Sequence, residues 1–127
     1  MKDYVCLDLE TSGLYPRLDK IIEIGAVKVL GGVAAERFQT FVHPGRKLSG
    51  HTSEITGITD RDLETAPYIE EALPEFLAFA GELPLLGHSV LFDYSFMKKA
   101  AVNQGLTFER TGVDTLKPVS YTHLTLP

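Results

Sequence analysis

The chain has 127 residues, of which 44% are hydrophobic and 23% are charged, and its formal net charge at pH 7 is −5. This composition is ordinary for a globular protein and argues against disorder, and the length predicts one domain. No apolar run approaches the roughly 20 residues that cross a bilayer, and no apolar signal region follows the N-terminus, so we expect a cytoplasmic protein without membrane contact. The acidity argues against a protein that holds nucleic acid chiefly by neutralising phosphates, so any such contact should be local and aided by cations.

The first predicted element is a short apolar strand, Tyr4–Leu7, which contains the single cysteine of the chain. One cysteine excludes an intrachain disulfide. No basic neighbour is visible in the sequence to lower the pKa of Cys6. We therefore expect a thiol in the core rather than a nucleophile.

Two acids follow this strand, in the segment Leu-Asp-Leu-Glu-Thr-Ser-Gly-Leu at residues 7–14. Residues two apart on a strand face the same side, so Asp8 and Glu10 should project together. Paired carboxylates are costly unless a cation lies between them, and Mg²⁺ prefers such ligands. From these residues alone, an exposed strand end whose acids face water explains the pattern equally well.

Two further strands are predicted next. The first is a mostly buried strand at Ile21–Leu30. A two-residue hairpin turn at Gly31–Gly32 connects it to the second strand, Val33–Val42. Together with the first strand they suggest three adjacent antiparallel strands. Residues 43–58 are expected to form a loop.

Helices and short strands alternate in the second half. Thr59 is a plausible helix N-cap with Asp62 three residues on, and a longer helix with one apolar face should end at Gly81. Its apolar face consists of Ile69, Ala72, Leu73, Phe76, Leu77 and Ala80, and Pro74 conflicts with it. A central strand at Pro84–His88, a helix ending at Gly105 and a weaker strand at Thr107–Val113 complete a mixed α/β layer fold.

The segment His88–Asp93 holds a third candidate acid. Asp93 stands at the start of a predicted helix, where an acid is often only favoured by the helix dipole. Together with Asp8 and Glu10, it would complete a site for divalent metal. His88 either donates to a phosphate or bonds to the backbone of its loop.

Five segments of the chain occur in an order and spacing that resemble a known family. They are residues 7–14, Ile-Ile-Glu-Ile-Gly-Ala-Val at 21–27, Thr-Gly-Ile-Thr-Asp at 56–60, Gly-His-Ser-Val-Leu-Phe-Asp at 87–93 and Asp-Thr-Leu at 114–116. Together they resemble a DnaQ-like 3′–5′ exonuclease of the DEDD group, of the proofreading type. The resemblance covers residues 3 to about 117, so residues 1–117 are expected to be an incomplete exonuclease domain.

The resemblance implies a fold and a reaction. The fold would be ribonuclease H-like, a mixed five-stranded sheet flanked by helices, with its C-terminal part missing. The reaction would be hydrolysis of the 3′-terminal phosphodiester of single-stranded DNA or RNA by a two-metal mechanism, releasing nucleoside monophosphates. A DNA polymerase subunit would be a possible partner, as in DNA polymerase III proofreading during replication.

The resemblance also assigns site residues. Asp8 and Glu10 would bind two Mg²⁺ or Mn²⁺ ions directly, and Asp93 would bind directly or through water. The residues that would contact substrate are Thr11 and Leu14 beside the 3′-terminal nucleotide, Ile58 lining its pocket and His88 near its phosphates. Glu23 would support the strand end, or else form a salt bridge at an edge.

The third motif of the family is absent from these residues. The family carries a histidine base on a later helix and a carboxylate five residues beyond it, whereas residues 118–127 contain no acid. We therefore expect residues 118–127 to be a short extended segment foreign to the domain, His123 not to be the base, and the fragment to be impaired or inactive. The alternative function is a non-catalytic module that binds single-stranded 3′ ends or docks on a polymerase. A nucleotide-binding α/β protein is disfavoured because no glycine-rich phosphate loop follows any strand.

Overall fold

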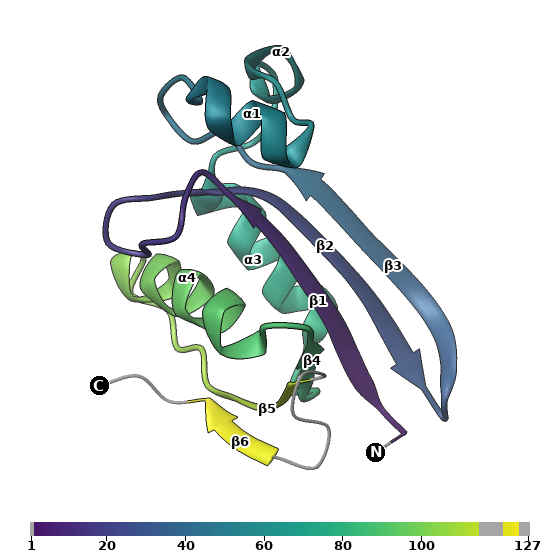
Figure 1. Ribbon diagram of the computed structural model, residues 1–127. Helices are drawn as coiled ribbons and strands as arrows, with labels where there is room; N and C mark the ends of the chain where they lie inside the picture. The colour runs from purple at the N-terminus through teal and green to yellow at the C-terminus, as the bar shows by residue number, and fades with distance from the viewer. Residues whose placement is uncertain (1, 115–120, 125–127) are drawn as a thin grey trace.

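A computed structural model describes residues 2–114 and 121–124 of the chain. The strands are β1 (Tyr4–Thr11), β2 (Ile21–Leu30), β3 (Val33–Phe41), β4 (Leu85–Gly87), β5 (Arg110–Asp114) and β6 (Tyr121–Leu124). The helices are α1 (Gly50–Thr56), α2 (Asp60–Leu63), α3 (Ile69–Ala80) and α4 (Val90–Asn103). Figure 1 shows α1 and α2 at one end of the sheet and α4 beside the strands.

The strands form one mixed sheet in the order β3-β2-β1-β4-β5-β6. The first three strands are antiparallel, as the sequence predicts, and β1, β4 and β5 run parallel to one another. The sheet therefore has the five expected strands and a sixth, β6, which pairs antiparallel with β5. Because β6 falls within residues 118–127, the expectation of an extended segment there is confirmed for residues 121–124.

The hairpin between β2 and β3 has the geometry that its glycines predict. Gly31 and Gly32 have φ values of 59° and 80°. Two consecutive positive φ values define a type I′ turn, whose twist matches that of the paired strands.

Residues 43–58 are not only a loop, because they contain the helix α1. The Ser49 side chain accepts a hydrogen bond from the Thr52 N–H at 3.1 Å, and Gly57 ends the helix with a φ of 75°. The prediction failed because this seven-residue helix buries only Thr52 and so has no apolar periodicity. At α2 the predicted N-cap is confirmed, since Thr59 and Asp62 form a complete capping box.

The main core lies on one face of the sheet, beneath α3 and α4. It joins strand residues such as Val5, Leu7 and Leu9 to helix residues such as Phe76 and Tyr94. The helix α3 continues through the exposed Pro74 and ends before Gly81 as expected. Among the described residues, no helix has the length and apolar character needed to cross a membrane.

Cys6 is not in this core. It alternates with Val5 and Leu7, which point to the helices, and therefore lies half-buried on the opposite face. The apolar run Tyr4–Leu7 gave no sign of this difference, because a strand can be apolar on both faces. Burial raises the pKa of the Cys6 thiol, which agrees with the prediction that it is not an activated nucleophile.

Candidate functional site

The two acids of β1 lie on the sheet face away from α3 and α4. Asp8 is exposed and Glu10 is half-buried, whereas the intervening Leu9 is buried in the core. On β2, Asp8 faces Gly25 and Glu10 faces Glu23. Because Gly25 has no side chain, the surface beside the Asp8 carboxylate stays open.

Glu10 is in an electrostatically unfavourable position. Partial burial raises its pKa, and the nearby carboxylates of Asp8 and Glu23 raise it further. Glu23 itself accepts a hydrogen bond from the Gln39 amide at 2.8 Å and forms no ion pair with a described residue. Repelling carboxylates of this kind are the donor set that a hard divalent cation stabilises.

A shallow groove of about 340 Å³ runs beside Asp8 on this face. Its lining includes Cys6, Gly25, Arg37 and Gln39. The groove is therefore open to solvent and carries charges of both signs next to the carboxylates.

Asp93 comes from a different element, the first turn of α4, and only 5% of its surface is exposed. A close approach of the preceding turn to β1 positions this helix start. A Cβ atom on Gly87 would lie 3.2 Å from the Leu7 carbonyl oxygen and 3.4 Å from Val90, which is too close without a backbone shift. Glycine at 87 thus lets the turn that carries the exposed His88 pack against β1.

Asp8, Glu10 and Asp93 are not shown to form a complete metal site. Within residues 2–114 and 121–124, no three His, Cys, Asp or Glu side chains are arranged as a group that could hold a metal ion. The structure unites Asp8 and Glu10 with Glu23 and places Asp93 on the adjacent helix. The donor oxygens on β1 fit a divalent ion, and the role of all three acids remains a prediction.

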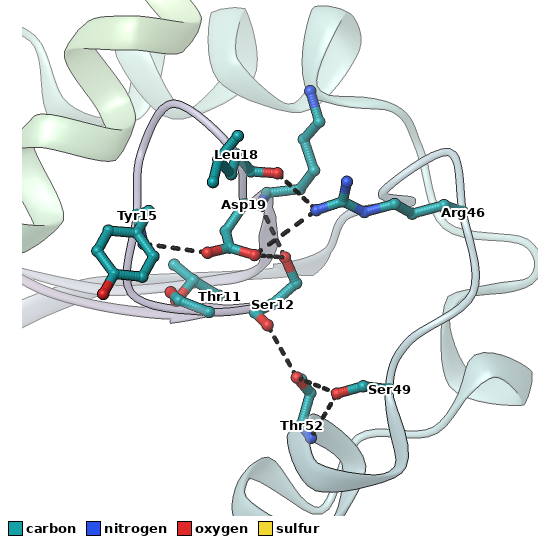
Figure 2. Close-up of polar contacts among 10 residues, drawn as sticks. Thr11, Ser12, Tyr15, Leu18, Asp19, Arg46, Ser49 and Thr52 are labelled. Atoms are coloured by element: carbon teal, nitrogen blue, oxygen red, sulfur yellow. Dashed lines mark hydrogen bonds and ion pairs between the residues drawn. The ribbon is translucent and has the colours of Figure 1, made fainter.

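The loop after β1 is held by a polar network that the sequence did not reveal (Figure 2). The Asp19 carboxylate accepts from the Tyr15 N–H at 3.0 Å and from the Ser12 hydroxyl at 3.3 Å, and it pairs with Arg46 at 3.6 Å. Arg46 also donates to the Leu18 carbonyl at 2.6 Å. One carboxylate thus joins both ends of the loop to the segment before α1.

The same network reaches α1. The Thr52 hydroxyl donates to the Ser12 carbonyl at 2.8 Å (Figure 2). The Lys20 N–H donates to the Ser12 hydroxyl at 2.9 Å. Gly13 allows this arrangement, because a Cβ atom there would overlap the Asp19 carboxyl group. The sequence pattern did not predict the role of Asp19, because an acid in a loop has no periodic pattern. The glycine at 13 is the one sequence feature that is typical of such a close approach between a backbone and another group.

The predicted substrate contacts have different environments. The Thr11 hydroxyl donates to the Gly13 carbonyl at 2.7 Å, and Leu14 is 72% exposed on the loop. Ile58 is buried in a small cluster with Ile22 and Leu63, so only a small part of it can meet a ligand. Their contacts with a nucleotide remain predictions.

Two residues named from the sequence have side chains outside the described residues. The backbone of His123 lies in β6, and its side chain is outside the described part of the chain. The same holds for the side chain of Asp114 at the end of β5.

Comparison with known proteins supplies the family. The model of a family described as exonuclease (RNase_T) matches residues 5–118. The PolC-type DNA polymerase III of Thermotoga maritima is 46% identical over 114 residues, which is 89% of this chain and 8% of that protein. The DNA polymerase III subunit epsilon of Aquifex aeolicus is 38% identical over 115 residues, which is 90% of this chain and 57% of that protein. The chain therefore spans only a part of these relatives.

Solved structures agree on the fold. Escherichia coli exonuclease I, in a complex with a dA13 oligonucleotide, superposes with a TM-score of 0.72 at 18% identity, over 84% of this chain and 25% of that one. This likeness supports the ribonuclease H-like fold with its mixed sheet. With the family model matching most of its residues, the chain belongs to the DnaQ-like exonucleases of the RNase_T family.

Proposed function

We propose that the chain carries the site of a metal-dependent 3′–5′ exonuclease acting on single-stranded nucleic acid. The observation that carries this proposal is the open Asp8–Glu10 pair on β1, in a chain whose match to the exonuclease family spans residues 5–118. Exonuclease I bound to an oligonucleotide supports the choice of a single strand as substrate.

In this proposal, the acids hold the ions and the loop holds the strand. Asp8 and Glu10 would hold two Mg²⁺ or Mn²⁺ ions, with Asp93 as a direct or water-mediated third partner. When bound, the ions activate the attacking water and stabilise charge on the phosphate and the leaving oxygen. Leu14, exposed on a loop that Asp19 fixes, contacts the terminal nucleotide, and His88 lies near its phosphate.

The relatives suggest where the domain works. Proteins named DNA polymerase III PolC-type and subunit epsilon support a role beside a DNA polymerase in the bacterial cytoplasm. Residues 1–117 form the exonuclease part of this proposal, and residues 118–127 lie outside it.

The alternative is a non-catalytic module that binds single-stranded 3′ ends or docks on a polymerase. Residues 118–127 lack the acid that the third motif requires. In the family, a histidine general base stands five residues before that acid, and losing a general base typically costs about 10²–10⁴-fold in rate. We therefore expect this chain to cleave slowly, and a chain extended by a native His and Asp five residues apart to cleave faster by about that factor.

The test uses a 5′-labelled single strand with Mn²⁺ and an excess of protein. The proposal predicts a ladder shortened from the 3′ end and release of nucleoside monophosphates, lost in Asp8→Asn and kept in the exposed control Glu54→Gln. Cleavage without metal, cleavage from the 5′ end or equal cleavage by Asp8→Asn would contradict it. Binding of 3′ ends without cleavage, by both this chain and the extended one, would favour the non-catalytic module.

A further inference from the structure

A second groove, of about 310 Å³, lies on the helix side of the molecule, away from the acids of β1. It is formed by the loop after β1, the segment His43–Gly45, the start of α3 and the later turns of α4. Its apolar lining includes Ile21, Val42, Phe96 and Ala100.

Cations gather at this groove without an ion-pair partner in the part of the chain that the structure describes. Lys20 and Lys99 line it, and neither they nor the nearby Arg17 form an ion pair with a described residue. Partial burial lowers the pKa of Lys99, and the positive charges of Lys20 and Arg17 lower it further. Repelling cations are unfavourable in the free protein, and an anion between them would remove the repulsion.

The acids of the groove do not neutralise these cations. The Asp19 carboxylate is bound by Arg46 and by the Ser12 and Tyr15 donors of the loop network. Glu70 is exposed in the first turn of α3. Arg17, Lys20 and Lys99 therefore form a local cationic site on a chain whose net charge is −5.

An aromatic surface stands at the same groove. Tyr68 is 53% exposed and stacks on His43, with ring centroids 4.6 Å apart and planes at 21°. An exposed ring fixed in this way offers a face on which a nucleobase can stack. Cations beside an aromatic platform are the combination that binds single strands without sequence preference.

The helix α4 connects this groove with Asp93 of the proposed catalytic site. Asp93 is in its first turn, and Ala100, seven residues on, lies on the same face of the helix. Lys99 is six positions after Asp93, so the two residues are about 9 Å apart along the helix axis. A strand whose 3′ end lies near Asp93 can therefore follow α4 to the groove.

We propose that this groove binds phosphates of the substrate strand upstream of its 3′-terminal nucleotides, with Lys20 and Lys99 as phosphate contacts and Tyr68 as a stacking surface. The inference rests on the proposed function, because it places the 3′ end at the acids of β1. A strand is favoured over a free nucleotide because the groove is open and is lined both by the loop after β1 and by α4, the helix that carries Asp93.

The experiment compares hydrolysis-resistant phosphorothioate strands of about three and about twelve nucleotides, of which the first is shorter than common single-strand sites and the second lies within their range. Their affinities are measured by fluorescence anisotropy at several salt concentrations. The proteins are the wild type, the double variant Lys20→Gln/Lys99→Gln, Tyr68→Ala and the control Lys2→Gln, which removes an exposed charge at the far end of β1.

The double variant should weaken binding of the long strand by about three- to tenfold and reduce the salt slope by about 1.4. The ratio of long-strand affinity to short-strand affinity should fall in the double variant and in Tyr68→Ala. The same ratio should be unchanged in Lys2→Gln. Equal weakening of both lengths, or no effect beyond that of Lys2→Gln, would overturn the groove assignment. The assignment would also be overturned if a nucleoside monophosphate binds in a way that depends on Lys99 and long strands do not displace it.

Failure of the proposed function would look different. If Asp8→Asn has no effect on hydrolysis but the double variant still loses long-strand affinity, the groove stands and the catalytic assignment fails. If Asp8→Asn abolishes hydrolysis and the double variant keeps the wild-type length dependence, only the groove assignment fails.

Discussion

Glu10 shows how a residue at the proposed site can oppose stability. Its side chain is half-buried, and this burial raises the pKa of the carboxyl group. The nearby carboxylates of Asp8 and Glu23 raise the pKa further. The folded state therefore holds a carboxylate that would be better solvated in the unfolded chain. Such a cost is typical of residues retained for a function other than folding.

Replacing Glu10 with Gln should stabilise the protein when divalent ions are absent. The amide keeps the size of the side chain and removes two repulsions, which at this exposure amounts to about 0.5 kcal/mol. Urea unfolding in a chelator measures the difference, with Glu54→Gln as a control for loss of one exposed charge. A variant less stable than the wild type would show that Glu10 has a stabilising partner instead.

At the scale of elements, the most consequential feature is the loop between β1 and β2. Its apolar residues Leu14, Tyr15 and Leu18 are 72%, 64% and 67% exposed. The Asp19 carboxylate nevertheless fixes the loop through Ser12, the Tyr15 N–H and Arg46. Exposed apolar side chains on a fixed loop fit a surface that meets nucleobases.

Gly13 and Asp19 should be energetically coupled. Gly13→Ala would displace the Asp19 carboxylate and break its hydrogen bonds, with an expected loss of about 1–3 kcal/mol in the free energy of unfolding. In an Asp19→Ala background the same change should cost much less, since the overlapping group is gone. Gly50→Ala serves as the control, because no atom lies within 4 Å of its added methyl group. Additive effects of the two substitutions would contradict the coupling.

Sequence reasoning succeeded where a pattern spans an element. Alternation placed Asp8 and Glu10 on one face of β1, and the glycine pair predicted the β2–β3 hairpin. It failed for α1, where capping by Ser49 matters more than periodicity, and for Cys6, whose strand is apolar on both faces. Asp19 was missed because its partners lie in a loop and in a distant segment, and only the folded chain brings these together.

At the scale of the molecule, charge is distributed unevenly. The chain is acidic overall, yet three cations that form no ion pair with a described residue, Arg17, Lys20 and Lys99, lie at or near one groove. On the other face of the sheet, the carboxylates of Asp8 and Glu10 on β1 and of Glu23 on β2 repel one another. A phosphate-bearing strand and divalent cations would relieve these two repulsions separately. Substrate and metal should therefore both stabilise the fold.

Mg²⁺ should raise the melting temperature. A ligand at ten times its dissociation constant adds about 1.4 kcal/mol by mass action, which is a shift of about 4–6 °C for a domain of this size. The shift should vanish in Asp8→Ala and persist in Glu54→Gln. An equal shift in all three proteins would show that the ion binds elsewhere.

The most direct test of the metal site is paramagnetic broadening of amide NMR signals by substoichiometric Mn²⁺. We predict that signals from the end of β1 around Asp8 and Glu10 and from the first turn of α4 around Asp93 broaden together. Broadening should disappear from both segments in Asp8→Asn. Broadening confined to β1, or spread over surface acids such as Glu70 and Glu75, would contradict a site shared by the three carboxylates.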